Sequence, residues 1–319
     1  MHTIRHSWFL GLLMGMVVIV ACGQATSSPI ASETTRPGET TALPSQTPAL
    51  TPALPAATLA SAATASRTQE ANSLPAAPQE IQFETDDGQI LNGRYYPAAI
   101  SPAPLVVLMH WAPGDQNEWN AIAAWLQNRG LARGSSGDQP WLDSSWFPPM
   151  LEGQSFAVFT YNFRNCEGGC KTFTRAAWLM DARAAMMKAR ELEGIDPHRI
   201  VAIGASIGAD GAPDGCNWVN TQFPNTCLGA LSLSPGGYLT IPYRKIVSTL
   251  GAEQPPKPAW CLYADGDGES KRACEDASGD NYKSVKYIGS NHGMELIEPD
   301  VDPSALQIIL DFLKSLFAI

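Results

Sequence analysis

From about residue 80 onward, short apolar runs alternate with segments whose apolar residues recur every three or four positions. The first two runs, 81–85 and 90–96, alternate apolar and polar residues around Asp86-Asp87-Gly88, which predicts an antiparallel hairpin. Six later runs are almost continuously apolar, as in strands that are buried on both faces. They are 105–109, 156–161, 200–203, 230–233, 260–263 and 284–287.

Helical periodicity fills the intervals between several of these runs. One apolar stripe is visible over 119–126, another over 178–189 and a third over 306–316, where Asp302 is the expected N-cap and Pro303 opens the first turn. Strands that alternate with helices predict an α/β protein with a mostly parallel central sheet flanked by helices. The N-terminal β-hairpin adds to this sheet, and we expect no large cap domain.

The N-terminal 21 residues have the pattern of a signal peptide. Arg5 precedes an apolar run over 8–21, which is shorter than the roughly 20 residues that span a bilayer, so an uncleaved anchor is the alternative. Ile19-Val20-Ala21-Cys22 resembles the lipobox of bacterial lipoproteins, which implies that Cys22 is acylated. We therefore expect an exported, membrane-anchored lipoprotein that faces the periplasm or the cell exterior.

The segment 22–79 differs from the rest of the chain in composition. It consists mostly of Ala, Thr, Ser and Pro without periodicity, so it cannot bury enough apolar surface to fold. We interpret it as a disordered tether between the lipid and one catalytic domain over 80–319.

The charge of the chain argues against one class of partner. Its formal net charge is -10 and no basic stripe is visible, whereas nucleic-acid binding needs concentrated Lys and Arg. A nucleic-acid partner is not expected, and we expect a monomer.

Six of the seven cysteines fall in the folded part of the chain. In an exported protein they predict disulfides, and nearest-neighbour pairing is our preference among 15 connectivities, with buried free thiols as the alternative. The preferred pairs are Cys166 with Cys170, Cys216 with Cys227, and Cys261 with Cys274. The Cys-x3-Cys spacing does not indicate a metal site, because further thiolate or imidazole ligands are lacking nearby. No metal and no cofactor are expected.

The apolar run 200–203 leads into Gly204-Ala205-Ser206-Ile207-Gly208. Gly-x-Ser-x-Gly between a buried strand and a helix allows a tight turn that exposes the serine hydroxyl. An ordinary glycine-rich turn is the alternative. Pro213 follows soon after, and we expect it to shorten or kink the helix.

With this motif the chain resembles the α/β-hydrolase superfamily over 80–319, and more closely its dienelactone-hydrolase-like and bacterial lipoprotein hydrolase branch. The resemblance implies that Ser206 is the nucleophile, followed by an acid after a later strand and a histidine near the C-terminus. His292, in Ser290-Asn291-His292-Gly293, matches the catalytic histidine, whereas His110 matches a structural one. His292 as an ordinary loop histidine is the alternative.

Two carboxylates follow the run 260–263. Asp267 fits the family offset better than Asp265, which is then expected to cap the loop, although either side chain has the right chemistry. The expected triad is Ser206, Asp267 and His292.

The oxyanion hole needs two backbone donors, and we expect Ile207 and Ala112 to supply them. Trp111 stands where many relatives have Gly, so it is expected either to line the acyl pocket or to pack in the core. A Trp- and Pro-rich stretch over 130–153 includes Trp146, a further substrate-binding candidate, and forms either a lid or a surface loop.

These residues predict a serine hydrolase that cleaves a small-molecule, ester-like substrate through an acyl-enzyme. A peptidase or an acyltransferase on the same fold is one alternative, because the pocket is not readable from the sequence. A non-catalytic, lipid-tethered binding protein is another.

Overall fold

The computed structural model describes residues 74–131, 139–150 and 152–317. The predicted signal peptide, Cys22 and the tether up to residue 73 lie outside the described residues.

The centre of the fold is one eight-stranded sheet with the strand order β1-β2-β4-β3-β5-β6-β7-β8. Strands β3 to β8 run parallel to one another, whereas the hairpin β1-β2 joins β4 antiparallel. The strands are β1 Gln79–Glu84, β2 Ile90–Tyr96, β3 Ala103–Met109, β4 Ala157–Tyr161, β5 Ile195–Ala205, β6 Cys227–Leu233, β7 Ala259–Ala264 and β8 Tyr282–Tyr287. All eight predicted strands, the hairpin and the mostly parallel sheet are confirmed.

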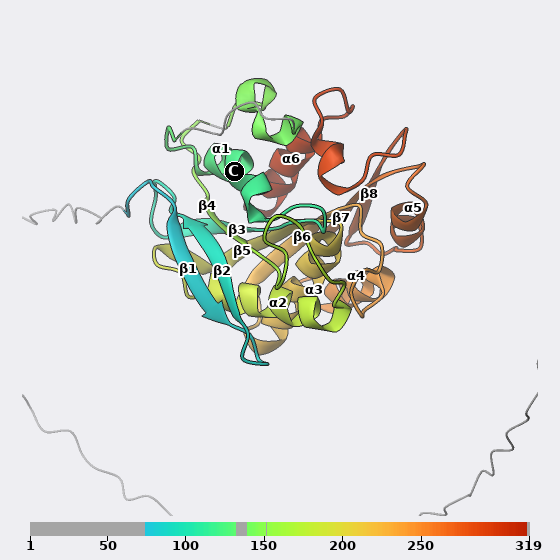
Figure 1. The fold of residues 1–319 in the computed structure, drawn as a ribbon, viewed down its shortest axis with the longest axis horizontal. Coiled ribbons are helices and arrows are strands. Elements are labelled where there is room, and N and C mark those ends of the chain that lie inside the picture. The colour runs from blue at the N-terminus through green and yellow to red at the C-terminus, as the bar shows by residue number, and fades with distance from the viewer. Residues whose placement is uncertain (1–73, 132–138, 151, 318–319) are drawn as a thin grey trace, which may run out of the picture. The chain divides into compact units, whose positions relative to one another are not determined.

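Helices cover both faces of the sheet, so the central strands are buried on both sides and need no polar face (Figure 1). The helices are α1 Asn120–Gln127, α2 Arg175–Ala189, α3 Ile207–Gln222, α4 Tyr243–Ala252, α5 Gly268–Glu275 and α6 Ala305–Phe317. α1 and α6 pack on one face, and α2, α3 and α4 pack on the other. None of the helices in the described ranges is long and apolar enough to cross a membrane.

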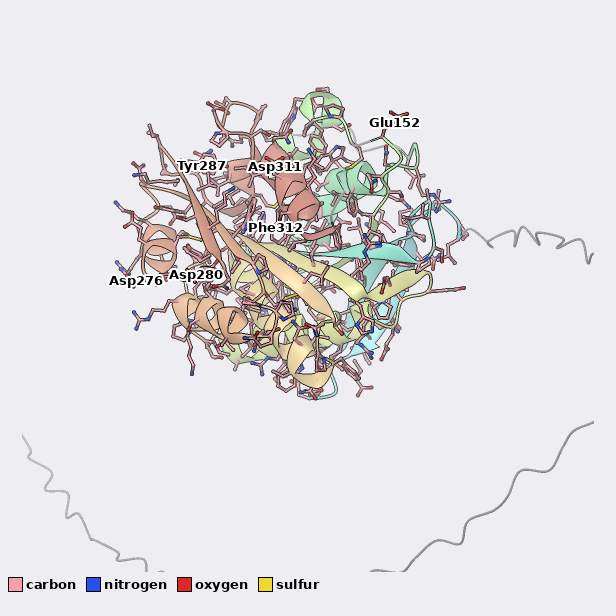
Figure 2. All side chains as sticks on the ribbon, turned by 180° about the vertical axis from the view of Figure 1, so that it is seen from behind. Glu152, Asp276, Asp280, Tyr287, Asp311 and Phe312 are labelled. Atoms are coloured by element: carbon pink, nitrogen blue, oxygen red, sulfur yellow. A yellow bond between two sulfur atoms is a disulfide. The ribbon has the colours of Figure 1, made fainter. Side chains whose placement is uncertain are left out.

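The amphipathic stripe of α6 shows how a helix is fixed to the sheet. Phe312 is fully buried and meets Trp260 of β7 with ring centroids 5.4 Å apart, while Asp311 on the same helix is exposed (Figure 2). Burial of an aromatic side chain of this kind contributes about 2 to 3 kcal/mol.

The expected N-cap of α6 was wrong. The helix begins at Ala305, and Ser304 Oγ accepts a hydrogen bond from the backbone N–H of Gln307 at 3.4 Å. Asp302 and Pro303 therefore precede the helix, because a serine closer to the apolar stripe serves as the cap.

Pro213 does not shorten α3, so of the two outcomes expected from the sequence, a shortened or a kinked helix, the first is wrong. The helix runs through it from Ile207 to Gln222. Because Pro213 has no N–H, the carbonyl oxygen of Ala209 lacks its usual helical donor, and the Ser232 hydroxyl on β6 donates to that oxygen at 2.7 Å. A side chain from the neighbouring strand thus satisfies the acceptor that the proline leaves open.

Three disulfides join nearest neighbours in the sequence. Cys216–Cys227 ties α3 to β6, and Cys261–Cys274 ties β7 to α5. Cys166–Cys170 closes a short turn after β4. Structural disulfides form and persist in oxidising compartments, so the three bridges indicate a protein outside the cytoplasm.

Candidate active site

Ser206 lies at the sharp turn between β5 and α3. Its φ of 52° is in the left-handed region, which non-glycine residues rarely adopt, and its backbone N–H donates to Leu233 O at 2.9 Å. Both flanking glycines are required by close backbone approach. A Cβ on Gly204 would overlap the carbonyl oxygen of Gly208, and a Cβ on Gly208 would overlap that of Met109. The motif thus forms the strained strand-to-helix turn expected of a nucleophile.

His292 and Asp267 meet at the same end of the sheet as Ser206. His292 Nδ1 lies 2.6 Å from Asp267 Oδ2, and both side chains are mostly buried. Since a carboxylate only accepts, Nδ1 carries the proton and Nε2 has its lone pair free. Gly293 adjoins Ser206, because a Cβ built on Gly293 would lie 3.7 Å from Ser206 Cβ. Ser206 Oγ and His292, both among the described residues, make no hydrogen bond to each other. A hydrogen bond between nucleophile and base often tightens only when substrate is bound.

Asp265 has a different hydrogen-bond partner from Asp267. Its Oδ1 accepts the backbone N–H of Gly289 at 3.1 Å, and its own N–H donates to Tyr287 O. Asp265 therefore holds the turn after β7 against the end of β8. Of the two carboxylates considered from the sequence, the structure brings Asp267 to the imidazole.

The segment 110–114 lies beside the N-terminus of α3, since Gly208 packs directly against the carbonyl groups of Met109 and His110. Ile207 is the first residue of α3, and the first N–H groups of a helix have no partner within it. The amides of Ile207 and Ala112 also make no backbone hydrogen bond to another described loop residue. Both are thus free to donate to a bound oxygen.

The buried side chain of His110 holds this segment in place. Its Nδ1 lies 2.7 Å from Trp111 O, and the Phe163 backbone N–H donates to its Nε2 at 3.0 Å, so Nδ1 carries the only ring proton. Complete burial lowers the pKa of His110 to about 4. His110 is therefore a neutral structural residue at pH 7.

This burial predicts a loss of stability at acidic pH. The unfolded chain protonates His110 near its ordinary pKa of about 6.5 but the folded chain does so only near 4, so folding loses free energy as pH falls through this window. We expect the residue to lower the free energy of unfolding by about 2 kcal/mol between pH 7 and pH 5. Urea denaturation of wild type and His110→Asn at both pH values measures this, because other titrations cancel in the difference. The difference in free energy of unfolding between wild type and variant should decrease by that amount at pH 5, whereas a constant difference would contradict the assignment of His110 as a buried neutral residue.

Trp111 is buried and contacts several parts of the site. Its indole N–H donates to Glu118, its ring meets Trp141 edge to face at 5.6 Å, and Gly293 packs on it without room for a side chain. Burial raises the pKa of Glu118 to about 7. Trp146 contacts Phe147 and donates its indole N–H to Pro140 O at 3.1 Å. The structure thus places Trp141, rather than Trp146, against Trp111.

Tyr238 is a site residue that the sequence did not indicate. Its ring packs edge to face on His292 with centroids 5.9 Å apart. Its backbone N–H donates at 2.5 Å to Asp210, a buried carboxylate one turn after Ser206 whose pKa burial raises to about 7. The only available signal was the Gly236-Gly237 pair after β6, which marks a tight turn at the edge of the sheet where the site lies.

In the described ranges, no group of three or more His, Cys, Asp or Glu side chains is arranged to hold a metal ion. The polar groups around Ser206 are instead a hydroxyl, an imidazole, a carboxylate and backbone amides.

Solved structures share this arrangement of strands and helices. An esterase from Pyrobaculum calidifontis is 16% identical with a TM-score of 0.54, over 78% of this chain and 88% of that one. An esterase from Pyrococcus furiosus is 14% identical with a TM-score of 0.52, over 75% and 93% respectively. The α/β hydrolase GrgF from Penicillium sp. sh18 is 13% identical with a TM-score of 0.53, over 76% and 100%. The chain has the α/β-hydrolase fold.

At these identities the similarity establishes the α/β-hydrolase fold alone, and the dienelactone-hydrolase-like branch stays a prediction. No protein-family model matches the chain. The uncharacterized protein YfhR of Escherichia coli K12 is 28% identical over 134 residues, 42% of this chain and 40% of that protein. The quorum-quenching protein AidA of Acinetobacter baumannii is 27% identical over 139 residues, 43% and 38% respectively. The chain thus spans about two fifths of the length of these curated relatives.

Proposed function

We propose that the domain over 80–319 is a serine hydrolase that cleaves a carboxylic ester-like bond through an acyl-enzyme. The observation that carries the proposal is the 2.6 Å contact between His292 and Asp267 at the end of the sheet where the strained Ser206 turn lies. These are the three types of group that activate a hydroxyl nucleophile on this fold, in the chain order Ser, acid, His. All three come from one chain, which is consistent with a monomer.

In the proposed mechanism, Nε2 of His292 accepts the proton of Ser206 Oγ as the oxygen attacks the ester carbonyl. Asp267 stabilises the imidazolium that forms, and the N–H groups of Ile207 and Ala112 donate to the carbonyl oxygen as it becomes an anion. The tetrahedral intermediate collapses when His292 returns the proton to the departing alkoxide, which leaves as an alcohol.

The second half of the reaction releases the acid. His292 takes a proton from a water molecule, the resulting hydroxide attacks the acyl-enzyme, and the proton returns to Ser206 Oγ as the acyl group leaves as a carboxylic acid. Trp111 precedes Ala112 in the proposed oxyanion loop, residues 110–114, and packs on Gly293, so we propose that it forms a wall of the acyl pocket, with Trp141 supporting it.

A substrate panel tests the proposal against its rivals. The purified protein is assayed with p-nitrophenyl esters of increasing acyl length, with peptide p-nitroanilides, and with an added alcohol as acyl acceptor. We expect turnover of esters. Preferential cleavage of the anilides would identify a peptidase, and preferential transfer to the alcohol an acyltransferase. No turnover of any substrate would favour a non-catalytic binding protein.

The same panel tests the proposed pocket wall. We expect Trp111→Ala to shift the preferred acyl length by two or more carbons, because the deleted indole enlarges the space beside Ser206. Trp146→Ala is the matched control, since Trp146 contacts Phe147 and Pro140 instead. Equal effects of the two substitutions would contradict the assignment of Trp111.

We also propose that the domain is tethered outside the cytoplasm by lipid on Cys22, within a mature chain whose residues 22–73 form a spacer. Residues 74–79, which the sequence assigned to the tether, are part of the domain: Gln79 begins β1, and the carbonyl oxygens of Leu74 and Ala76 accept hydrogen bonds from Arg129 and Gln127. The three disulfides support the oxidising location, and the lipobox-like sequence supports the lipid. Two acyl chains or more give stable anchoring, because each buried methylene contributes about 0.8 kcal/mol.

Cys22→Ala should release the protein from membranes. Without acylation the remaining chain has no lipid to insert, so we expect the variant in the soluble fraction after cell disruption and the wild type in the membrane fraction. Mass spectrometry of the wild-type N-terminus should detect the acyl groups. A variant that still sediments with membranes at its mature mass would contradict lipid anchoring.

A further inference from the structure

The turn closed by Cys166 and Cys170 is attached directly to the proposed oxyanion loop. The Cys170 backbone N–H donates to the carbonyl oxygen of Ala112 at 2.8 Å. The Gly168 N–H donates to Asp115 Oδ2, also at 2.8 Å, and a Cβ on Gly169 would lie 2.7 Å from Pro113 O. Three successive residues of the turn therefore fix the loop at and just after the residue whose amide is the proposed oxyanion donor.

Besides the disulfide, hydrogen bonds within the turn restrain it: the Gly169 N–H donates to Cys166 O and the Lys171 N–H donates to Asn165 O, both at 3.0 Å. Asn165, Gly168 and Gly169 all have positive φ, and Glu167 and Gly168 are exposed to solvent. A segment with two glycines has many alternative conformations, which a covalent cross-link removes. The disulfide connects the outer end of the turn, which holds Ala112, to Cys166, which is fully buried in the core.

The other contacts of the loop act on Trp111 rather than on Ala112. His110 binds the Trp111 carbonyl and Glu118 binds its indole, so both would persist if the turn loosened. Ala112 would then lose its one hydrogen bond to the turn while the preceding residue stayed in place. An oxyanion donor works only when it is preorganised, and a displacement of about 1 Å can cost up to about 100-fold in rate.

The three disulfides differ in access to solvent. Cys216, Cys227, Cys261 and Cys274 are all buried. Cys170 is partly exposed, so an external thiolate can reach the Cys166–Cys170 bridge first.

We propose that the Cys166–Cys170 disulfide is a redox-sensitive positioning element of the active site, which holds the amide of Ala112 in the oxyanion hole. This inference rests on the proposed function. Reduction by a dithiol proceeds by attack of one thiolate on the Cys170 sulfur, which breaks the S–S bond and forms a mixed disulfide. The second thiol of the reductant then displaces Cys170. The cysteines gain two electrons and two protons, and the dithiol becomes a cyclic disulfide.

The test uses the full protein and a short p-nitrophenyl ester. We expect Cys166→Ser/Cys170→Ser to lower kcat about 10- to 100-fold with less than a threefold change in KM, because the oxyanion contact acts in the transition state. The affinity for phenylboronic acid, which forms a tetrahedral adduct with a nucleophilic serine, should fall at least about tenfold. Dithiothreitol, titrated until alkylation and mass spectrometry show two free thiols, should bring the wild type to the level of the variant. It should not affect the variant further, and reoxidation should restore the wild type.

Several results would overturn the inference. One is a kcat equal to that of the untreated wild type in both the variant and the reduced protein. Another is a change in KM alone. A third is equal inactivation of wild type and variant by dithiothreitol, because the redox-sensitive site would then lie elsewhere. If the variant does not fold, the effect of reduction on the wild type still decides. An oxidised wild type that hydrolyses no ester would overturn the proposed function as well, whereas an active enzyme that is insensitive to reduction would overturn this inference alone.

Discussion

Ser206→Ala should lower kcat on a short p-nitrophenyl ester by at least about 1,000-fold, because no other group can form the acyl-enzyme. The residual rate would come from the oxyanion donors and substrate binding, which survive the substitution. The Ser206 side chain makes no capping hydrogen bond to α3, so the variant should fold and melt as the wild type does. Steady-state kinetics and circular dichroism measure the two effects separately.

Ser234→Ala is the matched control for this substitution. Ser234 follows β6 as Ser206 follows β5, it is also buried, and its φ of 57° is close to the 52° of Ser206. We expect its removal to change kcat less than about threefold, because Ser234 has no role in the proposed mechanism and its buried hydroxyl makes no hydrogen bond to another described residue. Similar losses in both variants would mean that local structure, rather than nucleophilic chemistry, explains the effect.

Asp267→Asn should lower kcat about 100- to 10,000-fold, the second largest effect that we expect. The carboxylate fixes the proton of His292 on Nδ1 and stabilises the imidazolium, whereas an amide can donate to Nδ1 and so favour the wrong tautomer. KM should change little, since Asp267 does not touch substrate in the proposed mechanism. The ratio of kcat values at saturating substrate measures the loss.

Asp265→Asn is the control in the same turn. Asp265 accepts one backbone N–H, from Gly289, and the amide oxygen of Asn can still accept it. We expect a change below about threefold. A larger loss in Asp265→Asn than in Asp267→Asn would transfer the role of the acid to Asp265.

The strands were predictable because each central strand is buried on both faces and so forms a continuous apolar run. The helix α5 was not predicted, since only Ser270 and Cys274 of its eight residues are buried and it has no apolar stripe. The outcome at Pro213 was not predictable either, because the group that compensates for it, Ser232, comes from another strand.

The candidate site likewise contains residues that the sequence could predict and residues that it could not. Ser206 could be found locally, because two glycines and a strand are enough to define its turn. The choice between Asp267 and Asp265 depended on the directions of two side chains in one turn, which spacing does not determine. Tyr238 and Glu118 were missed because each acts through a contact with a distant or irregular segment, and Trp141 was noted only as one member of the stretch 130–153. Such contacts have no periodic signal in a single sequence.

The most direct test of the central claim is covalent labelling of the folded protein with a fluorophosphonate, followed by peptide mass spectrometry. This reagent phosphonylates a serine only when a neighbouring base activates it, so it reports on Ser206 and His292 together whatever the natural substrate is. We predict one adduct, on Ser206, which is absent in Ser206→Ala and strongly reduced in His292→Ala. An adduct on another serine, or no adduct on protein whose fold is intact by circular dichroism, would contradict the assignment of Ser206 as the nucleophile.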